Sequence, residues 1–273
     1  MDLHSFDIHL HNLHGPLPTA AVRAHALNGL FHNVLGQRFP EVVDDLHRPN
    51  GPMPFSLAPL FNGEVFLGFR VGTLNAEFGQ RVAEVWGGLA TQRAEVQLGS
   101  AQLYVEEVKP GRPRATTYEQ LLAEAPAAHG LRLRFETPVR LKTFGHSGVL
   151  PTPHAVWQFY AQRWEKYADA GLPLPPEFMR WAGHNVQATE LALETRYAYI
   201  EKSVEWKGVM GEVEYQAFTD DNSLPESRIP DYLKAWQALA LFAEFCGTGE
   251  KATMGMGRTR RVKSFGEHRD KTG

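Results

Sequence analysis

The sequence contains a single cysteine, Cys246, so it can form no disulfide within the chain and no zinc site built from cysteine thiolates. It has no stretch of 18 apolar residues that could cross a membrane, and its first residues lack the basic and then apolar character of a secretory signal. Long low-complexity tracts are missing as well. These absences predict a folded, cytoplasmic protein. With 273 residues, 43% of them hydrophobic, it can bury one large core or two smaller ones.

Net charge is also small, at −3, but its distribution is uneven. Residues 1–126 hold 9 Lys and Arg against 13 Asp and Glu, whereas residues 127–273 hold 19 against 18. The densest basic stretch, residues 247–263, has five basic side chains and one acidic one. A local cluster matters more for binding phosphate groups than the charge of the whole chain, although a solvated basic strand would look the same.

Hydrophobic periodicity predicts the order β-α-β-β-α-β in the first half of the chain. Strands are indicated by alternating apolar and polar residues, helices by apolar residues every three to four positions, and a hairpin by Asn62-Gly63. The expected strands are 3–10, 55–61, 64–74 and 94–108, and the expected helices run from Pro18-Thr19 to Gly36 and from Asn75 to Gly87-Gly88. This order is that of a ferredoxin-like unit.

After a connector with one short helix (118–124), a second unit of the same order is predicted. Its strands are expected at 131–141, 190–206, 209–218 and 253–265, with a turn at Lys207-Gly208, and its helices at 153–170 and 232–245. The fold class is therefore α+β, with two tandem ferredoxin-like (βαββαβ) domains. We expect an N-terminal domain at residues 1–125, a C-terminal domain at 126–265 and a tail at 266–273.

The most informative segment runs from Cys246 to Arg258 and contains Gly247, Gly249, Gly255 and Gly257. Glycines let the backbone approach a ligand and turn its N–H groups outward, while Lys251 and Arg258 add charge that suits phosphate. Residues 247–252 formally fit the dinucleotide-binding pattern G-x-G-x-x-G/A, but that site needs a strand before the motif and a helix after it, the reverse of the expected order. The simplest alternative is a tight helix-to-strand turn that uses glycine for positive φ.

This segment resembles the C-terminal glycine-rich signature of the CRISPR-associated RAMP endoribonucleases, in which an apolar helix leads to G-x-G-x-K and then G-x-G before the last strand. The residues in that register are Gly247, Gly249, Lys251, Gly255 and Gly257. A second stretch is similar to the family's first helix and the loop that leads to its second strand; it comprises residues 29–33 (Gly-Leu-Phe-His-Asn), Leu46-His47 and residues 52–56 (Pro-Met-Pro-Phe-Ser). The two matches bracket residues 3–265. The resemblance implies a metal-independent endoribonuclease that cuts CRISPR repeat RNA.

The resemblance further implies that a 2′-hydroxyl of the RNA attacks the adjacent phosphate, which yields a 2′,3′-cyclic phosphate and a 5′-hydroxyl without any cofactor. Such a protein has to align the strand, move two protons and stabilise charge on the phosphoryl oxygens. His47 falls at the family's catalytic-histidine position, in an expected loop, and His32 lies where relatives place a catalytic tyrosine or histidine. His25, seven residues before His32, could line the same surface. Taken alone, a histidine in such a helix is more often a half-buried surface residue.

One position departs from the family pattern. Some relatives carry a lysine where this chain has Met53, so Arg48 or Lys142 becomes the candidate for the charge-stabilising cation.

Further RNA contacts are expected from a row of cations at even spacing, Arg132, Arg134, Arg140 and Lys142. Period two sends all four to one face of a strand, opposite the apolar side chains of the same segment. Together with Arg258 and Arg260, this face could form a groove for an RNA stem that is recognised through its phosphates and its shape. A charged strand face is, however, usually just solvated.

Three other functions remain open at this point. His9 and His11 would share a strand face near Asp7, but two histidines are only part of a metal site. A RAMP-type subunit that only binds guide RNA and does not cleave it would have no need of a histidine at position 47. A small-molecule enzyme would have a closed apolar pocket instead of a basic groove. The expected partner is CRISPR repeat RNA; other CRISPR effector subunits and a second copy of the chain are further candidates.

Overall fold

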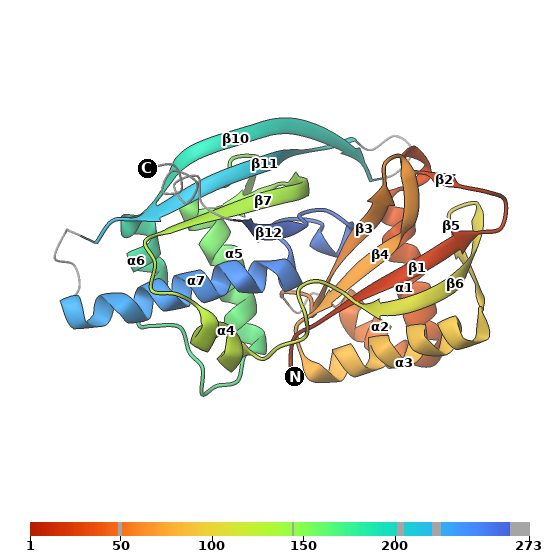
Figure 1. The fold of residues 1–273 in the computed structure, drawn as a ribbon, viewed down its shortest axis with the longest axis horizontal. Helices are drawn as coiled ribbons and strands as arrows, with labels where there is room; N and C mark the ends of the chain where they lie inside the picture. The colour runs from red at the N-terminus through yellow and green to blue at the C-terminus, as the bar shows by residue number, and fades with distance from the viewer. Residues whose placement is uncertain (49–50, 144, 201–204, 220–224, 263–273) are drawn as a thin grey trace, which may run out of the picture.

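The computed structural model of the chain describes residues 1–48, 51–143, 145–200, 205–219 and 225–262. Its elements form two halves that lie side by side, each with an antiparallel sheet and with helices packed against it (Figure 1). The predicted α+β fold class is confirmed, since each half has the strand order of a ferredoxin-like unit. Within the described ranges, no helix is both long enough and apolar enough to span a membrane.

The N-terminal half is built on a sheet whose four main strands follow the order β3-β4-β1-β6, with β2 paired to β4 and β5 paired to β6. The strands are β1 (His4–Asn12), β2 (Leu17–Pro18), β3 (Phe55–Asn62), β4 (Val65–Thr73), β5 (Glu95–Leu98) and β6 (Ala101–Pro110). The helices are η1 (Thr19–Ala21), α1 (Ala24–Arg38), α2 (Pro40–His47) and α3 (Ala76–Gln92). Phe31, Phe69 and Trp86 lie at the centre of this half's core and are completely buried.

The C-terminal half has a sheet in the order β10-β11-β7-β12. Its strands are β7 (Gly130–Val139), β10 (Val186–Tyr199), β11 (Glu205–Ala217) and β12 (Thr259–Val262), and β8 (Leu141–Thr143) and β9 (His146–Gly148) form a separate hairpin. Its helices are α4 (Tyr118–Glu124), α5 (Pro153–Tyr167), α6 (Phe178–Asn185), η2 (Glu226–Arg228), α7 (Ile229–Cys246) and η3 (Ala252–Met254). The core between sheet and helices is aromatic, with Trp157, Tyr160 and Trp236 completely buried.

Buried hydrogen bonds join the two halves. Ser56 Oγ of β3 donates to the carbonyl oxygen of Phe245 in α7 at 2.6 Å, and Tyr118 Oη of α4 donates to the carbonyl oxygen of Leu74 at 2.8 Å. Helix α4 itself packs against α7, in the same core cluster as the C-terminal sheet. Because these contacts are buried, the surfaces that the halves present to each other have a fixed relative position.

Two helices were not predicted, and both are short. Helix α2 begins at Pro40, whose fixed φ suits a first helical position, and ends at His47. The expectation that His47 lies in a loop is therefore wrong, because this residue is the last one of a helix. Helix α6 is likewise only eight residues long, too short for a clear apolar period.

The predicted turn at Lys207-Gly208 is also wrong. Both residues lie inside β11, and the connection from β10 falls between Tyr199 and Glu205. Gly208 is needed there for packing, since a Cβ on it would come within 2.8 Å of the carbonyl oxygen of Val139 in the neighbouring strand.

Other boundaries shifted by less. The capping role of Asn75 is confirmed, because its side chain accepts a hydrogen bond from the N–H of Phe78 at 2.8 Å. Helix α3 continues through Gly87-Gly88, which face open space, and residues 94–108 hold the β5–β6 hairpin in place of one strand. The first helix begins at Ala24, after η1. The tail at 266–273 and the end of the last expected strand lie outside the described residues.

Candidate active site

The glycine-rich loop connects α7 to β12, and its four glycines all have positive φ. The values are 65° at Gly247, 83° at Gly249, 93° at Gly255 and 70° at Gly257. A Cβ at Gly249 would overlap the carbonyl oxygen of Arg140, and one at Gly257 would overlap that of Thr248. The loop therefore needs glycine both for its backbone conformation and for its close packing on the end of β7 and on itself.

The backbone N–H groups of this loop are largely used within the protein. Thr248 N–H donates to Gly257 at 2.7 Å, Glu250 N–H donates to Arg140 at 2.7 Å, and Gly257 N–H donates to Pro138 at 3.0 Å, in each case to the carbonyl oxygen. The expectation that the loop turns its N–H groups outward is wrong for these three residues. Contacts to a ligand are left mainly to side chains, above all to the exposed Lys251.

The arginines expected on a basic strand face are paired with carboxylates. Arg132, whose side chain is only 9% exposed, reaches Glu212 at 3.0 Å and Glu214 at 3.2 Å, and Arg134 also contacts Glu212. Although burial alone would raise it, the hydrogen bonds from Arg134 and Arg132 lower the pKa of Glu212. These ion pairs neutralise much of the positive charge on this face of the sheet.

Two arginines after the glycine loop join the same face. Arg258 and Arg260 both reach Glu136, at 2.7 Å and 3.3 Å, and Arg260 lies opposite Arg134 in the pairing of β12 with β7. Arg140 and Lys142 do not share this face. Strand β7 ends at Val139, after which Arg140 pairs with Glu250 at 2.6 Å and stacks on Trp206. The single row of four cations is therefore split at the end of β7.

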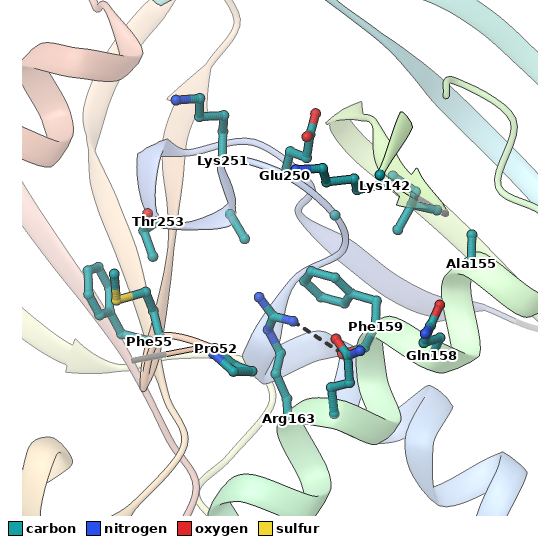
Figure 2. Close-up of a pocket in the computed structure, with 17 residues that line it drawn as sticks. Pro52, Phe55, Lys142, Ala155, Gln158, Phe159, Arg163, Glu250, Lys251 and Thr253 are labelled. Carbon is teal, nitrogen blue, oxygen red and sulfur yellow. Dashed lines mark hydrogen bonds between the residues drawn. The ribbon is translucent and has the colours of Figure 1, made fainter. Parts of the chain in front are cut away.

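A cleft of about 560 Å³ lies between the two halves, beside the glycine loop (Figure 2). One wall comes from the segment 51–55, and the opposite wall comes from α5 and the β8–β9 hairpin. Three cations line it, Lys142, Arg163 and Lys251, and within the part of the chain that the structure describes none of them has a carboxylate within ion-pair distance. The acidic side chain in the lining, Glu250, is already bound by Arg140 and by Ser147 Oγ at 2.9 Å. The cleft therefore suits an anion.

His32 of α1 and His47 at the end of α2 lie beside each other, with ring centroids 5.1 Å apart. His32 is partly buried between Phe31 and Phe55, whereas His47 is exposed. Burial, and then the charge of His47, lower the pKa of His32 to about 4, so that its ring is neutral at pH 7. Its Nδ1 atom is buried and has no hydrogen-bond partner among the described residues. The pair combines a neutral ring with one that is open to solvent.

The histidine pair adjoins the cleft. The ring of Phe55 lies 5.9 Å from that of His32 and also lines the cleft. One helical turn before His32, Asn28 donates a hydrogen bond of 2.9 Å to the carbonyl oxygen of Thr253, which belongs to the glycine loop and to the cleft wall. Helix α1 thus connects the loop to the histidines.

The remaining candidates lie further out. Arg48 is exposed and forms an ion pair with Asp45 at 3.2 Å. The side chain of His25 is exposed near the start of α1. Its backbone N–H donates to the carbonyl oxygen of Ile200. Over the described ranges, no three His, Cys, Asp or Glu side chains gather in a way that could hold a metal ion. His11 stacks on Tyr104, and a bulge after His9 interrupts the strand.

Sequence reasoning missed three residues of this region, Asn28, Phe159 and Arg163. Asn28 precedes the quoted family segment and has no motif of its own. Phe159 and Arg163 lie on α5, a segment for which the sequence predicted a helix and no function. Only the spacing of Phe159 and Arg163, an aromatic followed four residues later by a cation, could have suggested that they share a helix face.

Comparison with known proteins confirms the resemblance found in the sequence. A family model for the CRISPR-associated endoribonuclease Cas6 matches residues 133–259, just under half of the chain. The CRISPR-associated endoribonuclease Cas6 of Mycobacterium tuberculosis is 24% identical over 245 residues, which cover 89% of this chain and 74% of that protein.

Solved structures extend the similarity to nearly the whole fold. A Cas6 product complex is 25% identical with a TM-score of 0.77, and the match covers 96% of this chain and all of that one. Cas6 of Thermus thermophilus matches at 22% identity with a TM-score of 0.70, over 96% of this chain and 98% of that one. The tandem ferredoxin-like arrangement is therefore shared with Cas6 structures.

Proposed function

This chain is similar to the Cas6 endoribonucleases of CRISPR systems along most of its length, and on that basis we propose that it cleaves CRISPR repeat RNA into guide RNAs without a metal ion. One observation carries the proposal: the His32–His47 pair lies beside a cleft whose three cations lack carboxylate partners in the described chain. Histidines can move the protons and the cations can hold the phosphates. The reaction needs no further group, because the nucleophile belongs to the RNA.

The two histidines would divide the proton transfers. The neutral His32 ring takes the proton from the 2′-hydroxyl, whose oxygen then bonds to the adjacent phosphorus. The bond from phosphorus to the 5′-oxygen breaks, and the exposed His47, carrying a proton, gives it to that leaving oxygen. The products are a 2′,3′-cyclic phosphate and a 5′-hydroxyl. A phosphate close to His32 would raise the pKa of its ring above 4 and so make it a better base.

The cleft would hold the charge that develops on the phosphate. Lys142 and Lys251 approach it from the β8–β9 hairpin and the glycine loop, and Lys142 remains the candidate cation in place of Met53. Arg48 is a weaker candidate, because it is exposed and already paired with Asp45. On this proposal residues 1–125 supply the histidines, and residues 126–265 supply most of the cations.

The outer face of the C-terminal sheet offers a second place for the RNA stem. Arg132, Arg134, Arg258 and Arg260 lie along it, each bound to a carboxylate. Phosphates would have to compete with these carboxylates, so we propose that this face contributes less to affinity than the cleft does.

The proposal is tested by incubating the purified protein with a CRISPR repeat RNA in excess EDTA. We expect cleavage at one site and a cyclic phosphate on the 5′ fragment, both unchanged by the chelator. An RNA with a 2′-deoxy sugar before the scissile phosphate serves as the control and should be bound but not cut. Cleavage that vanishes with EDTA and returns with magnesium or manganese would contradict the mechanism. Binding without any cleavage would favour the alternative of a guide-RNA-binding subunit.

A further inference from the structure

Arg163 of α5 has an unusual environment for an arginine that is partly withdrawn from solvent. Its guanidinium lies over the ring of Phe159, with Cζ 3.4 Å from the ring centroid, and Nη1 donates to the carbonyl oxygen of Phe159 at 3.2 Å. Two other partly buried arginines have a carboxylate close by, Arg70 with Asp7 and Arg258 with Glu136, whereas Arg23 contacts only the ring of Tyr199 among the described residues. Arg163 has no carboxylate within ion-pair distance in the ranges that the structure covers.

The titratable groups around Arg163 do not supply the missing negative charge. Cys246, Tyr160 and Tyr167 are the acidic groups that act on it, and burial raises the pKa of each, to about 12 for Cys246 and Tyr167. All three are therefore neutral at pH 7. Burial lowers the pKa of Arg163 to about 10, which still leaves it charged. Its positive charge also lowers the pKa of Lys166, after the larger effect of burial.

An unpaired charge that is partly withdrawn from water destabilises a fold unless something balances it. Figure 2 shows the guanidinium pointing into the cleft, with Pro52 and Phe159 beside it and Lys142 and Lys251 on the far side. The contact with Phe159 restrains the guanidinium, and among the described residues its hydrogen bond is the one to the carbonyl oxygen of Phe159, so its other N–H groups can bind a ligand. A planar donor fork of this kind matches two oxygens of one phosphate.

We propose that Arg163 binds a phosphate of the RNA backbone inside this cleft and thereby positions the strand beside the histidine pair. The inference rests on the proposed function for the identity of the ligand, but the anion site itself does not. It also gives the cleft a cation on the wall opposite Met53. Lys142 and Lys251 would hold neighbouring oxygens of the same strand.

The test compares Arg163→Met with Arg163→Lys. Methionine keeps an apolar stem on Phe159 and removes the charge, whereas lysine keeps the charge and loses the fork. The matched control is Arg93→Met, which removes an arginine that also stacks on an aromatic ring, Tyr104, but lies outside the cleft. For each protein we would measure the melting temperature with and without millimolar inorganic pyrophosphate, and the affinity for a 2′-deoxy-blocked repeat RNA at several salt concentrations.

We expect pyrophosphate to raise the melting temperature of the wild-type protein and of Arg93→Met, but not that of Arg163→Met. Without pyrophosphate, Arg163→Met should melt at or above the wild-type temperature, because the unbalanced charge is gone. Its RNA affinity should fall about tenfold, with a salt slope that is smaller by about 0.7. The RNA affinity of Arg163→Lys should lie between that of the wild type and that of Arg163→Met.

The opposite pattern would overturn the inference. If Arg163→Met melts earlier than the wild type while pyrophosphate stabilisation and RNA affinity stay at wild-type values, Arg163 only packs against Phe159. If pyrophosphate stabilises the wild type through Arg163 but repeat RNA is not bound, the anion site stands and the proposed function fails. If RNA is bound and cut equally well by wild type and Arg163→Met, the proposed function stands and the role of Arg163 fails.

Discussion

His32 and His47 face each other with their ring centroids 5.1 Å apart, although they belong to different helices. The reason is the sharp change of direction at Phe39-Pro40, where α1 ends and α2 begins. Phe31 and Phe55 pack around His32 and withdraw it from water, while His47 stays at the surface. The ring of His32 therefore carries a proton less readily than it would in water.

The lowered pKa of His32 predicts a dependence of stability on pH. The folded protein binds this proton only near pH 4, whereas the unfolded chain binds it near 6.5, so acid favours the unfolded state. The unfolding free energy that depends on a neutral His32 is fully present above about pH 6.5 and is lost progressively as the pH falls to 4. Relative to His32→Gln, the wild type should lose roughly 1 to 2 kcal/mol of unfolding free energy between pH 7 and pH 5.

Urea unfolding at several pH values measures this difference. His25→Gln is the matched control, because His25 lies on the same helix but is exposed. Parallel curves for wild type and His32→Gln from pH 7 to pH 5 would mean that His32 is not withdrawn from water as the structure indicates.

The pair also predicts separate effects on chemistry and on binding. His47→Ala removes a proton donor but little basic surface, so RNA affinity should stay within a few-fold of the wild type. The single-turnover cleavage rate should fall by about 10² or more. His32→Ala should behave in the same way, and the double variant should be far from additive, because the two rings act as a unit. An unchanged rate for His47→Ala at saturating enzyme would remove this residue from the active site.

Much of the fold could be predicted because its signals are local. The hairpin at Asn62-Gly63, the cap at Asn75 and the apolar alternation of 131–135 each follow from a few neighbouring residues. The Lys207-Gly208 turn failed for the opposite reason. Gly208 is required because the carbonyl oxygen of Val139, in the neighbouring strand, leaves no room for a Cβ. Val139 lies 69 positions earlier in the sequence, so no local pattern carries that information.

The candidate site, too, has features that local sequence signals predict and others that depend on residues distant in the chain. His32 and His47 were found by their positions in a motif, but their contact depends on the angle between two helices. The arginines at 132 and 134 looked free in the sequence, because their partners Glu212 and Glu214 lie on a strand that is distant in the chain. Arg163 looked like an ordinary helix residue in the sequence. What distinguishes it is that no carboxylate of the described residues lies within ion-pair distance, and only the fold can show this.

The two expected phosphate contacts near the glycine loop should now behave differently. Lys251→Ala removes a cation of the cleft that has no carboxylate partner among the described residues, so RNA affinity should fall and the salt slope should drop by about 0.7 to 0.9. Arg258→Ala instead breaks an ion pair with Glu136 outside the cleft. It should lower the unfolding free energy by about 1 kcal/mol or more while affinity stays near the wild-type value.

Filter binding over a range of salt, with urea unfolding of the same proteins, checks both variants. If Arg258→Ala weakens RNA binding as strongly as Lys251→Ala does, the outer face of the C-terminal sheet is a main RNA contact. The ranking of cleft over sheet face would then be wrong.

The last prediction concerns the glycines of the loop. Gly249 has φ of 83°, and an added Cβ would overlap the carbonyl oxygen of Arg140, so Gly249→Ala should lower the unfolding free energy by about 2 kcal/mol or more. It should also reduce cleavage, since the same loop carries Lys251. Gly87→Ala is the matched control, because Gly87 lies inside α3 with open space around it. There the exchange should raise stability by roughly 0.5 to 1 kcal/mol and leave cleavage unchanged. Equal stability of the two variants in urea would show that the loop tolerates a side chain at Gly249, and the close packing on Arg140 would no longer explain why glycine is there.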